Sequence, residues 1–408
     1  MMKNFDMNAR HVIEALRSGV PSRSVGRYFS EARPQILREI GNHLQAVSEE
    51  KKPQSMIITG KYGEGKTHLL NTVIGIAHSS NMVVSYVSLG KETPFDKLNV
   101  VYQKAISNTF LPGHEQPGFS RILDQMTPGS PLAGEMLLYA TRELETDKLY
   151  YLLQSYMHTE DQEERFQLLS DLEGDFIANP LLKSIYKRIF NQPAKFRVNF
   201  SKTKHTMDYF AFMSHLFTTL GYDGWVILFD EAELCGRLGA KTRINVYRNM
   251  ARFLLPEETN EVHLGSIYTM FAFSASYIED VISGKYEYEN LEKYFPDTME
   301  PARTVLHLIE AAPQLVPLTN EEIREILGRI AEFHREAYSW EPEVTPDLLM
   351  QATRGAHLLR TRIRAAIEYL DQLYQYGRAD AASLSDLSSG DFTEKVPDLS
   401  AEEEKALS

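Results

Sequence analysis

The feature that most constrains the fold of this chain is one glycine-rich run, Gly60-Lys61-Tyr62-Gly63-Glu64-Gly65-Lys66-Thr67. It matches the pattern G-x-x-x-x-G-K-[ST] at every position, and its glycines let successive backbone N–H groups turn inward around a phosphate. The β-prone run Ser55–Thr59 precedes it and the apolar helical stretch Leu69–Ala77 follows it. Because this is the strand–loop–helix context that the motif requires, the sequence predicts a phosphate-binding loop rather than a chance glycine-rich turn.

The residues of this loop predict a nucleoside triphosphate bound together with Mg²⁺. Lys66 is expected to reach the β- and γ-phosphates, and the Thr67 hydroxyl is expected to ligate the metal. ATP is favoured over GTP because the chain has no guanine-reading Asn-Lys-x-Asp motif. We interpret His68 as a packed or hydrogen-bonded side chain rather than a catalytic one. The predicted nucleotide contacts come from Gly60, Tyr62, Gly63, Glu64, Gly65, Lys66, Thr67 and His68.

An acidic motif supplies the second half of the predicted site. The apolar run Trp225–Phe229 is typical of a buried parallel strand, and Asp230 and Glu231 follow it directly. Asp230 is expected to hold Mg²⁺, mostly through water, and Glu231 to orient and deprotonate the attacking water. The alternative is that the two acids only cap the next helix. Glu233 is interpreted as a solvated side chain.

Hydrophobic periodicity predicts the remaining elements. Further strands are expected at Val83–Leu89 and Ile267–Phe273. Helices are expected at Asn8–Ser18, Pro34–Val47, Phe95–Phe110, Ala133–His158, Glu163–Leu172, Pro180–Phe190, Met207–Leu220, Lys241–Leu255, Asn320–Trp340, Pro346–Thr353 and Leu358–Tyr376. This order predicts an α/β fold, a three-layer parallel-sheet P-loop NTPase core with a helical insertion and a C-terminal all-helical lid.

The same pattern divides the chain into domains. We expect N-terminal helices over residues 1–54, an ATPase core over 55–316 with the insertion at about 112–206, and the lid over 317–378. Residues 379–408 are rich in serine and acidic residues with few large apolar ones, so a disordered tail is expected there.

Composition excludes several classes of protein. A single cysteine, Cys235, leaves no internal disulfide framework and no cysteine-rich zinc site, and the histidines show no zinc-binding spacing. The N-terminus has no apolar stretch typical of a signal peptide, and no window reaches the roughly 20 apolar residues of a membrane helix. We therefore expect a cytoplasmic protein without a membrane association. The formal net charge of −13 argues against non-specific coating of nucleic acid but leaves room for a local basic groove.

One such basic stretch is present in the insertion. It comprises Lys183, Lys187, Arg188, Lys195, Arg197, Lys202 and Lys204. This stretch is either a surface for a phosphate backbone or an ordinary solvated face, and the sequence leaves both readings open. The aromatic residues of Tyr139–Tyr156 are interpreted as core rather than as base-stacking side chains, because they recur at helical spacing.

Two features favour hydrolysis over binding alone. Glu231 follows the metal carboxylate directly, and later arginines are candidates for the γ-phosphate. Arg248 or Arg252 in the predicted helix Lys241–Leu255 is a candidate finger for a neighbouring subunit, or a contact to DNA, against the alternative of a solvated helix face. Arg303, just ahead of an apolar strand candidate at Val305–Ile309, is another.

Together these motifs resemble the AAA+ ATPases, and among them the initiator-like branch. The resemblance rests on the P-loop, the strand that ends in Asp230-Glu231, the polar end of Phe271-Ala272-Phe273-Ser274, and the helical module after Thr319. It implies that Ser274 senses the γ-phosphate, although a serine there is equally typical of a helix N-cap. It also implies that the helical module covers the nucleotide and supplies a second sensor, Arg362, with Arg360 next.

More narrowly, the chain resembles the ATP-binding proteins of bacteriophage-exclusion (BREX) and related anti-phage systems. The matching residues are Val12–Pro21, Gly60–Leu70 and Leu228–Glu233. The resemblance is expected to cover Val12–Leu89 and Met207–Leu373, and not the insertion Pro112–Thr206. It implies a defence or DNA-transaction ATPase that acts beside a helicase, methyltransferase or nuclease.

The hypothesis from sequence is therefore a Mg²⁺-dependent ATPase that acts as an oligomeric switch or motor, a homo-oligomer, in a multi-protein, DNA-related defence system. DNA is kept as a candidate partner. The alternative from another class is an ATP-binding scaffold or signalling module with little or no turnover. A small-molecule kinase is less favoured, because no acceptor pocket is evident and the predicted lid is long.

Overall fold

The computed structural model describes residues 9–18, 33–62, 64–114, 116–259, 262–341, 344–356 and 359–379. Gly63 of the predicted loop and residues 380–408 of the predicted tail lie outside these ranges. The described residues belong to two compact units. The first draws on Met1–Ile40, Thr59–Ile76 and Pro313–Ala401, and the second on Gly41–Ile58 and Ala77–Ala312. No helix in these parts of the chain is long and apolar enough to span a bilayer.

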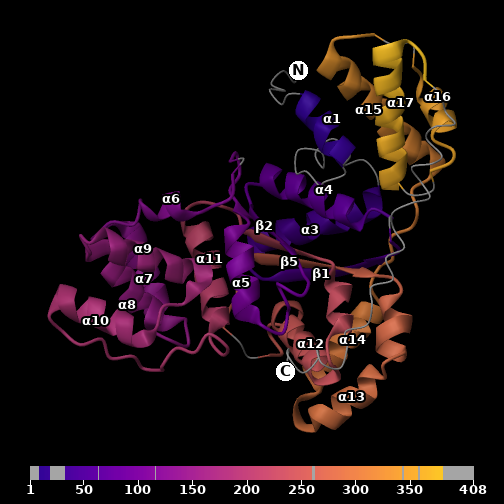
Figure 1. Ribbon diagram of the computed structural model, residues 1–408. Helices are drawn as coiled ribbons and strands as arrows, with labels where there is room; N and C mark the ends of the chain where they lie inside the picture. The colour runs from indigo at the N-terminus through magenta and orange to yellow at the C-terminus, as the bar shows by residue number, and fades with distance from the viewer. Residues whose placement is uncertain are drawn as a thin grey trace. The chain divides into compact units, whose positions relative to one another are not determined.

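A five-stranded, mostly parallel sheet in the order β1-β5-β4-β2-β3 organises the second unit (Figure 1). Its strands are β1 (Gln54–Gly60), β2 (Val83–Ser88), β3 (Thr109–Phe110), β4 (Trp225–Asp230) and β5 (Ile267–Ser274). Strands β2, β4 and β5 are parallel, and β3 pairs with β2 in the antiparallel sense. Every residue of β4 is buried, because a central parallel strand is covered on both faces. The predicted α/β class is confirmed.

The helices of the second unit form two groups, and the members α11 and α12 pack on the same face of the sheet, where Phe210 and Phe253 contact each other and the rings of Trp225 and Phe229. Helices α7, α8, α9 and α10 cluster together with α11, and α12 packs against α13 and α14 (Figure 1). The helices are α5 (Leu98–Ser107), α6 (Ser120–Leu123), α7 (Pro131–Arg142), α8 (Lys148–His158), α9 (Gln162–Ser170), η1 (Asp171–Asp175), α10 (Asn179–Phe190), α11 (Thr206–Thr219), η2 (Ala232–Arg237), α12 (Ala240–Leu254), η3 (Ile278–Ser283), α13 (Glu287–Tyr294), η4 (Pro296–Thr298) and α14 (Glu300–Glu310).

The prediction of one continuous helix over Ala133–His158 is wrong. Helix α7 ends at Arg142 and α8 begins at Lys148. Between them the Asp208 carboxylate accepts hydrogen bonds from the backbone N–H groups of Glu145 (3.1 Å) and Thr146 (2.8 Å) and from the Thr146 hydroxyl (2.9 Å). Because a distant side chain satisfies these donors, the helical ladder is interrupted there.

The strand predicted at Val305–Ile309 is also wrong, since these residues lie in α14. Its buried residues are Ala302, Val305, Leu306 and Ile309. They recur every three or four positions, which is the period of a helix face, and a five-residue window is too short to reveal it.

A buried ion pair anchors the helical insertion. Lys148 Nζ donates to Asp171 Oδ2 over 2.6 Å, and both side chains are 0% exposed. Tyr209 donates its hydroxyl proton to the other oxygen of the Asp171 carboxylate, and the ammonium group lies 4.3 Å from the ring centroid of Phe200. Burial raises the pKa of Asp171 and lowers that of Lys148, while their attraction opposes both shifts. This pair connects α8, η1 and α11.

In the first unit, α1 (Ala9–Ser18) packs with α15 (Asn320–Tyr338), α16 (Pro346–Ala352) and α17 (Leu359–Tyr376) around one apolar core (Figure 1). The N-terminal helix contributes Val12, Ile13 and Leu16, which lie on one face of it. Helix α15 begins with a capping box, in which Thr319 and Glu322 satisfy each other's backbone N–H groups. Segments at the two ends of the described chain thus share a core. Helices α3 (Pro34–Glu50) and α4 (Lys66–Ser79) have residues in both units.

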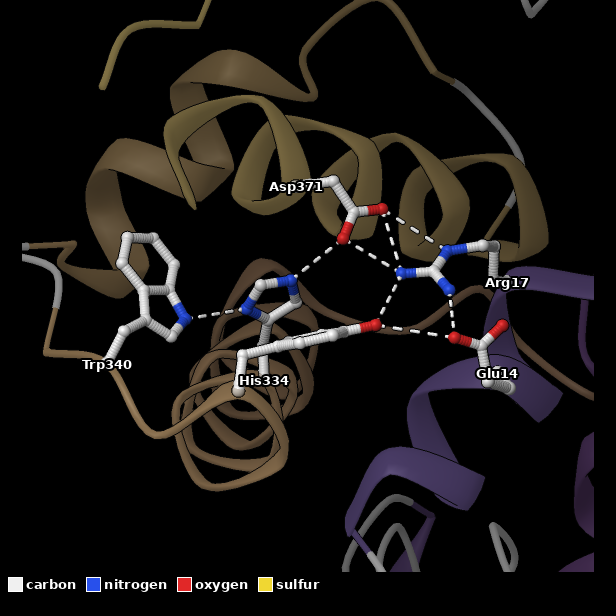
Figure 2. A network of polar contacts seen from close by, with 6 residues as sticks. Glu14, Arg17, His334, Trp340 and Asp371 are labelled. Carbon is white, nitrogen blue, oxygen red and sulfur yellow. Dashed lines mark hydrogen bonds and ion pairs between the residues drawn. The ribbon is translucent and has the colours of Figure 1, made fainter. Parts of the chain in front are cut away.

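A polar network fixes α1 to α15 and α17 (Figure 2). Arg17 binds the Asp371 carboxylate through two nitrogens, Nη2 to Oδ1 at 2.8 Å and Nε to Oδ2 at 3.2 Å. His334, 0% exposed, lies between Asp371 (Nε2 to Oδ1, 3.0 Å) and Trp340, whose Nε1–H donates to its Nδ1 over 2.9 Å. Because Trp340 is the donor to Nδ1, the proton of a neutral His334 sits on Nε2 and points at Asp371.

We expect Asp371→Ala to lower the free energy of unfolding of the first unit by about 2–4 kcal/mol, because it leaves the buried His334 without its acceptor and leaves Arg17 with only Glu14 and Tyr338. Urea denaturation followed by Trp340 fluorescence measures this change. The control is Asp347→Ala, whose carboxylate is 67% exposed and pairs with Arg324 at the surface. It should cost less than about 1 kcal/mol. Equal costs for the two variants would contradict a specific role for the network.

Candidate functional site

The predicted phosphate-binding loop lies in the first unit, between β1 and the start of α4. Lys66 Nζ donates to the carbonyl oxygens of Gly60 (2.9 Å) and Lys61 (3.4 Å) at the beginning of the loop. Glu64 Oε2 accepts a hydrogen bond from Lys61 N over 2.6 Å. Helix α4 begins at Lys66, so its unpaired N–H groups and positive end are at the loop. The loop is therefore held closed by its own side chains and carries donors suited to phosphate.

Gly65 requires its glycine because of its backbone conformation. Its φ of +88° is a left-handed conformation that side chains disfavour. Space is not the reason, because a Cβ at this position would make only ordinary contacts with Arg33 Nη1 (3.5 Å) and Leu359 Cδ2 (3.7 Å). Leu359 is the first residue of α17, so the loop lies beside the beginning of that helix. Next along the chain, burial lowers the pKa of His68 to about 4, with the Arg33 charge as a second cause, so its imidazole is neutral at pH 7.

Arg33 is a site residue that sequence reasoning missed. Its side chain is buried, and its guanidinium donates to the backbone carbonyl oxygens of Glu64 in the loop and of Val316 (3.3 Å). Its backbone N–H donates to Glu322 Oε1 over 3.2 Å. Burial lowers the pKa of Arg33, and the charges of Glu322 and Glu64 oppose this shift. The signal in the sequence was its place directly before Pro34, a predicted helix start.

The predicted metal and water-activating carboxylates lie in the second unit, at the end of β4. Asp230 is 3% exposed, and its Oδ2 accepts a hydrogen bond from the Tyr86 hydroxyl over 2.6 Å. Glu231 is exposed, and its Oε2 accepts a hydrogen bond from Ser88 Oγ over 2.8 Å. Both donors come from the neighbouring strand β2, in which Ser88 pairs with Asp230 in the parallel register. Sequence reasoning missed Tyr86 and Ser88.

The backbone at Glu231 has an uncommon conformation. Its φ is +58° and its ψ is +33°, in the left-handed region, which is rarely adopted by residues other than glycine, asparagine and aspartate. Such conformations gather at functional sites, where the surroundings hold them. The Glu231 side chain makes no capping hydrogen bond to the helix η2 that follows it. The geometry thus disfavours the alternative in which this residue only caps the next helix.

Ser274 lies at the end of β5, the next strand in the sheet. Its backbone N–H donates to Glu233 Oε2 over 3.1 Å, and its hydroxyl lies 3.2 Å from that of Ser276. The interpretation of Glu233 as a solvated side chain is therefore wrong, because its carboxylate connects the turn after β4 to the end of β5.

The candidate arginines have distinct surroundings. Arg248 lies over the ring of Phe295, 4.6 Å from its centroid, and burial with the neighbouring Arg252 charge lowers its pKa. Arg303 donates to Glu292 Oε1 over 3.1 Å. Arg362 Nε on α17 donates to Thr353 Oγ1 over 3.2 Å, in the same unit as the loop. The side chain of Arg360 lies outside the described residues.

Each unit contributes an oxygen donor of the kind that magnesium takes in proteins. Among the described residues, no group of three or more histidine, cysteine, aspartate or glutamate side chains forms a metal site by itself. Mg²⁺ in nucleotide sites takes one or two protein oxygens and completes its shell with phosphate and water, so such a group is not required. Thr67 offers a hydroxyl and Asp230 a carboxylate, which are oxygen ligands of this kind.

Comparison with known proteins identifies the family of this chain. It matches the family described as the BREX system ATP-binding protein BrxC/D over residues 6–128 and 152–388. The chain belongs to this family. Membership confirms the resemblance inferred from sequence and identifies an ATP-binding protein with a role in a BREX anti-phage system. No curated protein matches the chain.

The extent of the family match corrects one expectation. We expected the resemblance to exclude the insertion Pro112–Thr206, but the match includes residues up to 128 and resumes at 152. Only 129–151, which holds α7 and the beginning of α8, falls between the two matched ranges. Most of the insertion therefore belongs to the family rather than to this chain alone.

We expect Arg33→Ala to weaken ATP binding about tenfold, a loss of about 1.4 kcal/mol, because the loop would lose the guanidinium that connects the Glu64 carbonyl to the Val316 carbonyl. Arg33→Lys should recover only part of the loss, since an ammonium cannot reproduce the planar guanidinium contacts. Titration with a fluorescent ATP analogue measures the dissociation constants. Arg38→Ala, at an exposed position of α3, is the control and should bind like the parent protein. Equal affinity of the Arg33→Ala and Arg38→Ala variants would refute this role.

Proposed function

We propose that this BREX-family protein is a Mg²⁺-dependent ATP hydrolase of AAA+ type that acts as an oligomeric switch or motor. The observation that carries the proposal is the placement of two successive carboxylates at the end of β4. Asp230 is buried and receives the Tyr86 hydroxyl, whereas Glu231 is exposed and oriented by Ser88. Metal binding needs a carboxylate that is held in place, as Asp230 is, and water activation needs one that a water molecule can reach, as Glu231 is.

Each predicted residue has a role in this proposal. Lys66 and the loop amides bind the β- and γ-phosphates, Thr67 and Asp230 hold Mg²⁺, and Glu231 accepts a proton from the attacking water. The bound metal supplies positive charge at the phosphate oxygens. Ser274 acts as a polar sensor of the γ-phosphate, and Arg362 acts as the second sensor from a helical lid. Support for these last two roles comes from the AAA+ resemblance and from their positions at a strand end and on α17.

The oligomeric part of the proposal concerns Arg248. An arginine supplied by a neighbouring subunit stabilises charge that develops in phosphoryl transfer and can contribute several powers of ten in rate. The ring of Phe295 holds the Arg248 guanidinium in a defined direction from α12. We propose that homo-oligomerisation brings this arginine to a neighbour's nucleotide. A helicase, nuclease or methyltransferase of the multi-protein system is the proposed partner protein.

Glu231→Gln is expected to bind ATP normally and to lose at least about 100-fold in turnover, because the amide cannot accept the proton of the attacking water. Lys66→Ala should lose ATP binding itself. Ser88→Ala should lower kcat with little change in KM, because Glu231 loses its orienting donor. Phosphate release with ATP and Mg²⁺ measures these values, and Glu279→Gln, at an exposed position of η3, is the control. Tight ATP binding without turnover under every condition would support the scaffold alternative instead.

Hydrolysis per subunit should rise with protein concentration across the assembly point if Arg248 acts in a neighbour's site. Arg248→Ala should lower that rate about 10³-fold or more without preventing assembly. Mass photometry or sedimentation measures assembly alongside phosphate release. A rate per subunit that is the same well below and well above the assembly point would exclude an arginine supplied in trans.

A further inference from the structure

The insertion contains a segment whose charge is opposite to that of the rest of the chain. Residues 176–207 include no aspartate or glutamate, although the whole chain has a formal net charge of −13. The segment carries Lys183, Lys187, Arg188, Lys195, Arg197, Lys202 and Lys204. An acidic chain that concentrates unopposed positive charge in one segment has a local field that differs from its overall field.

The fold brings the two halves of this segment together. Lys183 Nζ on α10 lies 4.5 Å from the ring centroid of Phe196 in the connection that follows the helix. Asn179 Nδ2, at the first position of α10, donates to the carbonyl oxygen of Phe200 over 3.0 Å. Earlier positions of the helix thus meet later positions of the connection, which runs back along α10 before α11 begins (Figure 1). Its lysines and those of α10 consequently share one region of the surface.

Most of this charge is not neutralised within the protein. Arg188 pairs with Glu164, and Arg197 Nε lies 3.8 Å from Asp147 Oδ2. The five lysines, by contrast, make no ion pair with a carboxylate in the described part of the chain, and we call them the basic strip: Lys183, Lys187, Lys195, Lys202 and Lys204. Four of the five are exposed, and Lys183 and Lys187 lie one turn apart on the same helix face, where they repel each other.

Aromatic rings lie beside the lysines of this strip. The ring of Tyr151 contacts those of Tyr186 (centroids 4.8 Å apart) and Phe196 (5.3 Å), and Tyr186 contacts Phe190 (4.6 Å). All four rings are partly exposed, although Tyr151, which we interpreted as core from the sequence, packs against the apolar core together with Phe196. They come from α8, α10 and the connection, and their mutual packing holds them rigid. Partly exposed rings between cationic side chains form the stacking surface that proteins use for unpaired bases.

We propose that the basic strip binds the phosphate backbone of a single-stranded nucleic acid, with the partly exposed aromatic rings against its bases. The strip supplies five cationic groups, the rings favour unpaired bases over a duplex, and the absence of acidic residues from 176–207 removes local repulsion. The proposal is independent of the proposed ATP hydrolysis, because none of the strip lysines belongs to the phosphate-binding loop or to the pair Asp230 and Glu231.

The test is a pair of quadruple variants of the full chain that remove the same amount of charge. The strip variant carries Lys187→Gln, Lys195→Gln, Lys202→Gln and Lys204→Gln. The control variant carries Lys51→Gln, Lys52→Gln, Lys104→Gln and Lys293→Gln, which are exposed positions elsewhere in the second unit. Fluorescence anisotropy measures binding to labelled oligo-dT, to its RNA counterpart and to a duplex with an equal number of phosphates, over a series of salt concentrations.

The strip variant should lose at least about tenfold in affinity for oligo-dT, with a slope of log K against log salt that is about 3 units shallower, since each released phosphate contact contributes about 0.7. The control variant should bind within about twofold of the parent protein. Thermal denaturation should be unchanged in both, because all eight positions are exposed. Binding should also persist in Lys66→Ala, which separates this proposal from the failure of ATP binding.

Three results would overturn the proposal. Absence of binding to both oligo-dT and its RNA counterpart by the parent protein is one, and equal loss in both quadruple variants, which indicates overall charge alone, is another. Tighter binding to the duplex than to either single strand would overturn the assignment to single strands. Comparison of oligo-dT with its RNA counterpart identifies the source of the strand, and tighter binding of either one than of the duplex supports the proposal.

Discussion

A buried carboxylate at the end of a central parallel strand is the constraint on which the candidate site of the second unit depends. Asp230 is 3% exposed, and a carboxylate so placed needs hydrogen-bond donors to offset lost hydration. Tyr86 and the backbone N–H of Glu231 supply them. Because the second donor belongs to the next residue, satisfying Asp230 also helps to set the left-handed turn that presents the Glu231 side chain to solvent. The contacts that satisfy the buried Asp230 carboxylate thus also set the position of Glu231 for the proposed chemistry.

In the first unit, the Glu322 carboxylate likewise accepts hydrogen bonds from two separate parts of the chain. It accepts hydrogen bonds from Thr319 N (2.7 Å) as part of the α15 cap and from Arg33 N (3.2 Å). Arg33 in turn binds the Glu64 carbonyl in the phosphate-binding loop. A change in the loop when phosphate binds would therefore alter the contacts at the beginning of α15 through two residues. A helix cap contributes about 1 kcal/mol to stability, which is less than the free energy that nucleotide binding can supply. Binding at the loop is therefore strong enough to change the contacts that cap α15.

The sequence was sufficient to predict those elements that depend on the pattern of neighbouring residues. Strands β1 and β4, helix α4 and the amphipathic helices of the first unit follow from motif and periodicity, and the structure confirms these elements. The binding of phosphate by the loop between β1 and α4 stays a prediction. It was insufficient where a partner comes from far along the chain. The break between α7 and α8 depends on Asp208, some 60 residues later, and the importance of Ser88 depends on the strand register that places it opposite Asp230. No local pattern specifies which strand becomes the neighbour, so Tyr86 and Ser88 could not be assigned from composition or spacing. The contacts of Arg33 to Glu64 and Val316 likewise join residues far apart in the chain.

The charge distribution limits the distance over which the basic strip attracts nucleic acid. Salt screens charges beyond a Debye length of about 8 Å, so neither the net charge of −13 nor the strip acts far from the surface of the protein. Under the proposal above, the strip would attract a strand only when that strand is already close to α10. It would therefore hold a strand that is brought near it rather than draw nucleic acid from a distance. The family match extends over residues 152–388 and includes the whole strip, so this property would belong to the part of the chain that defines the family.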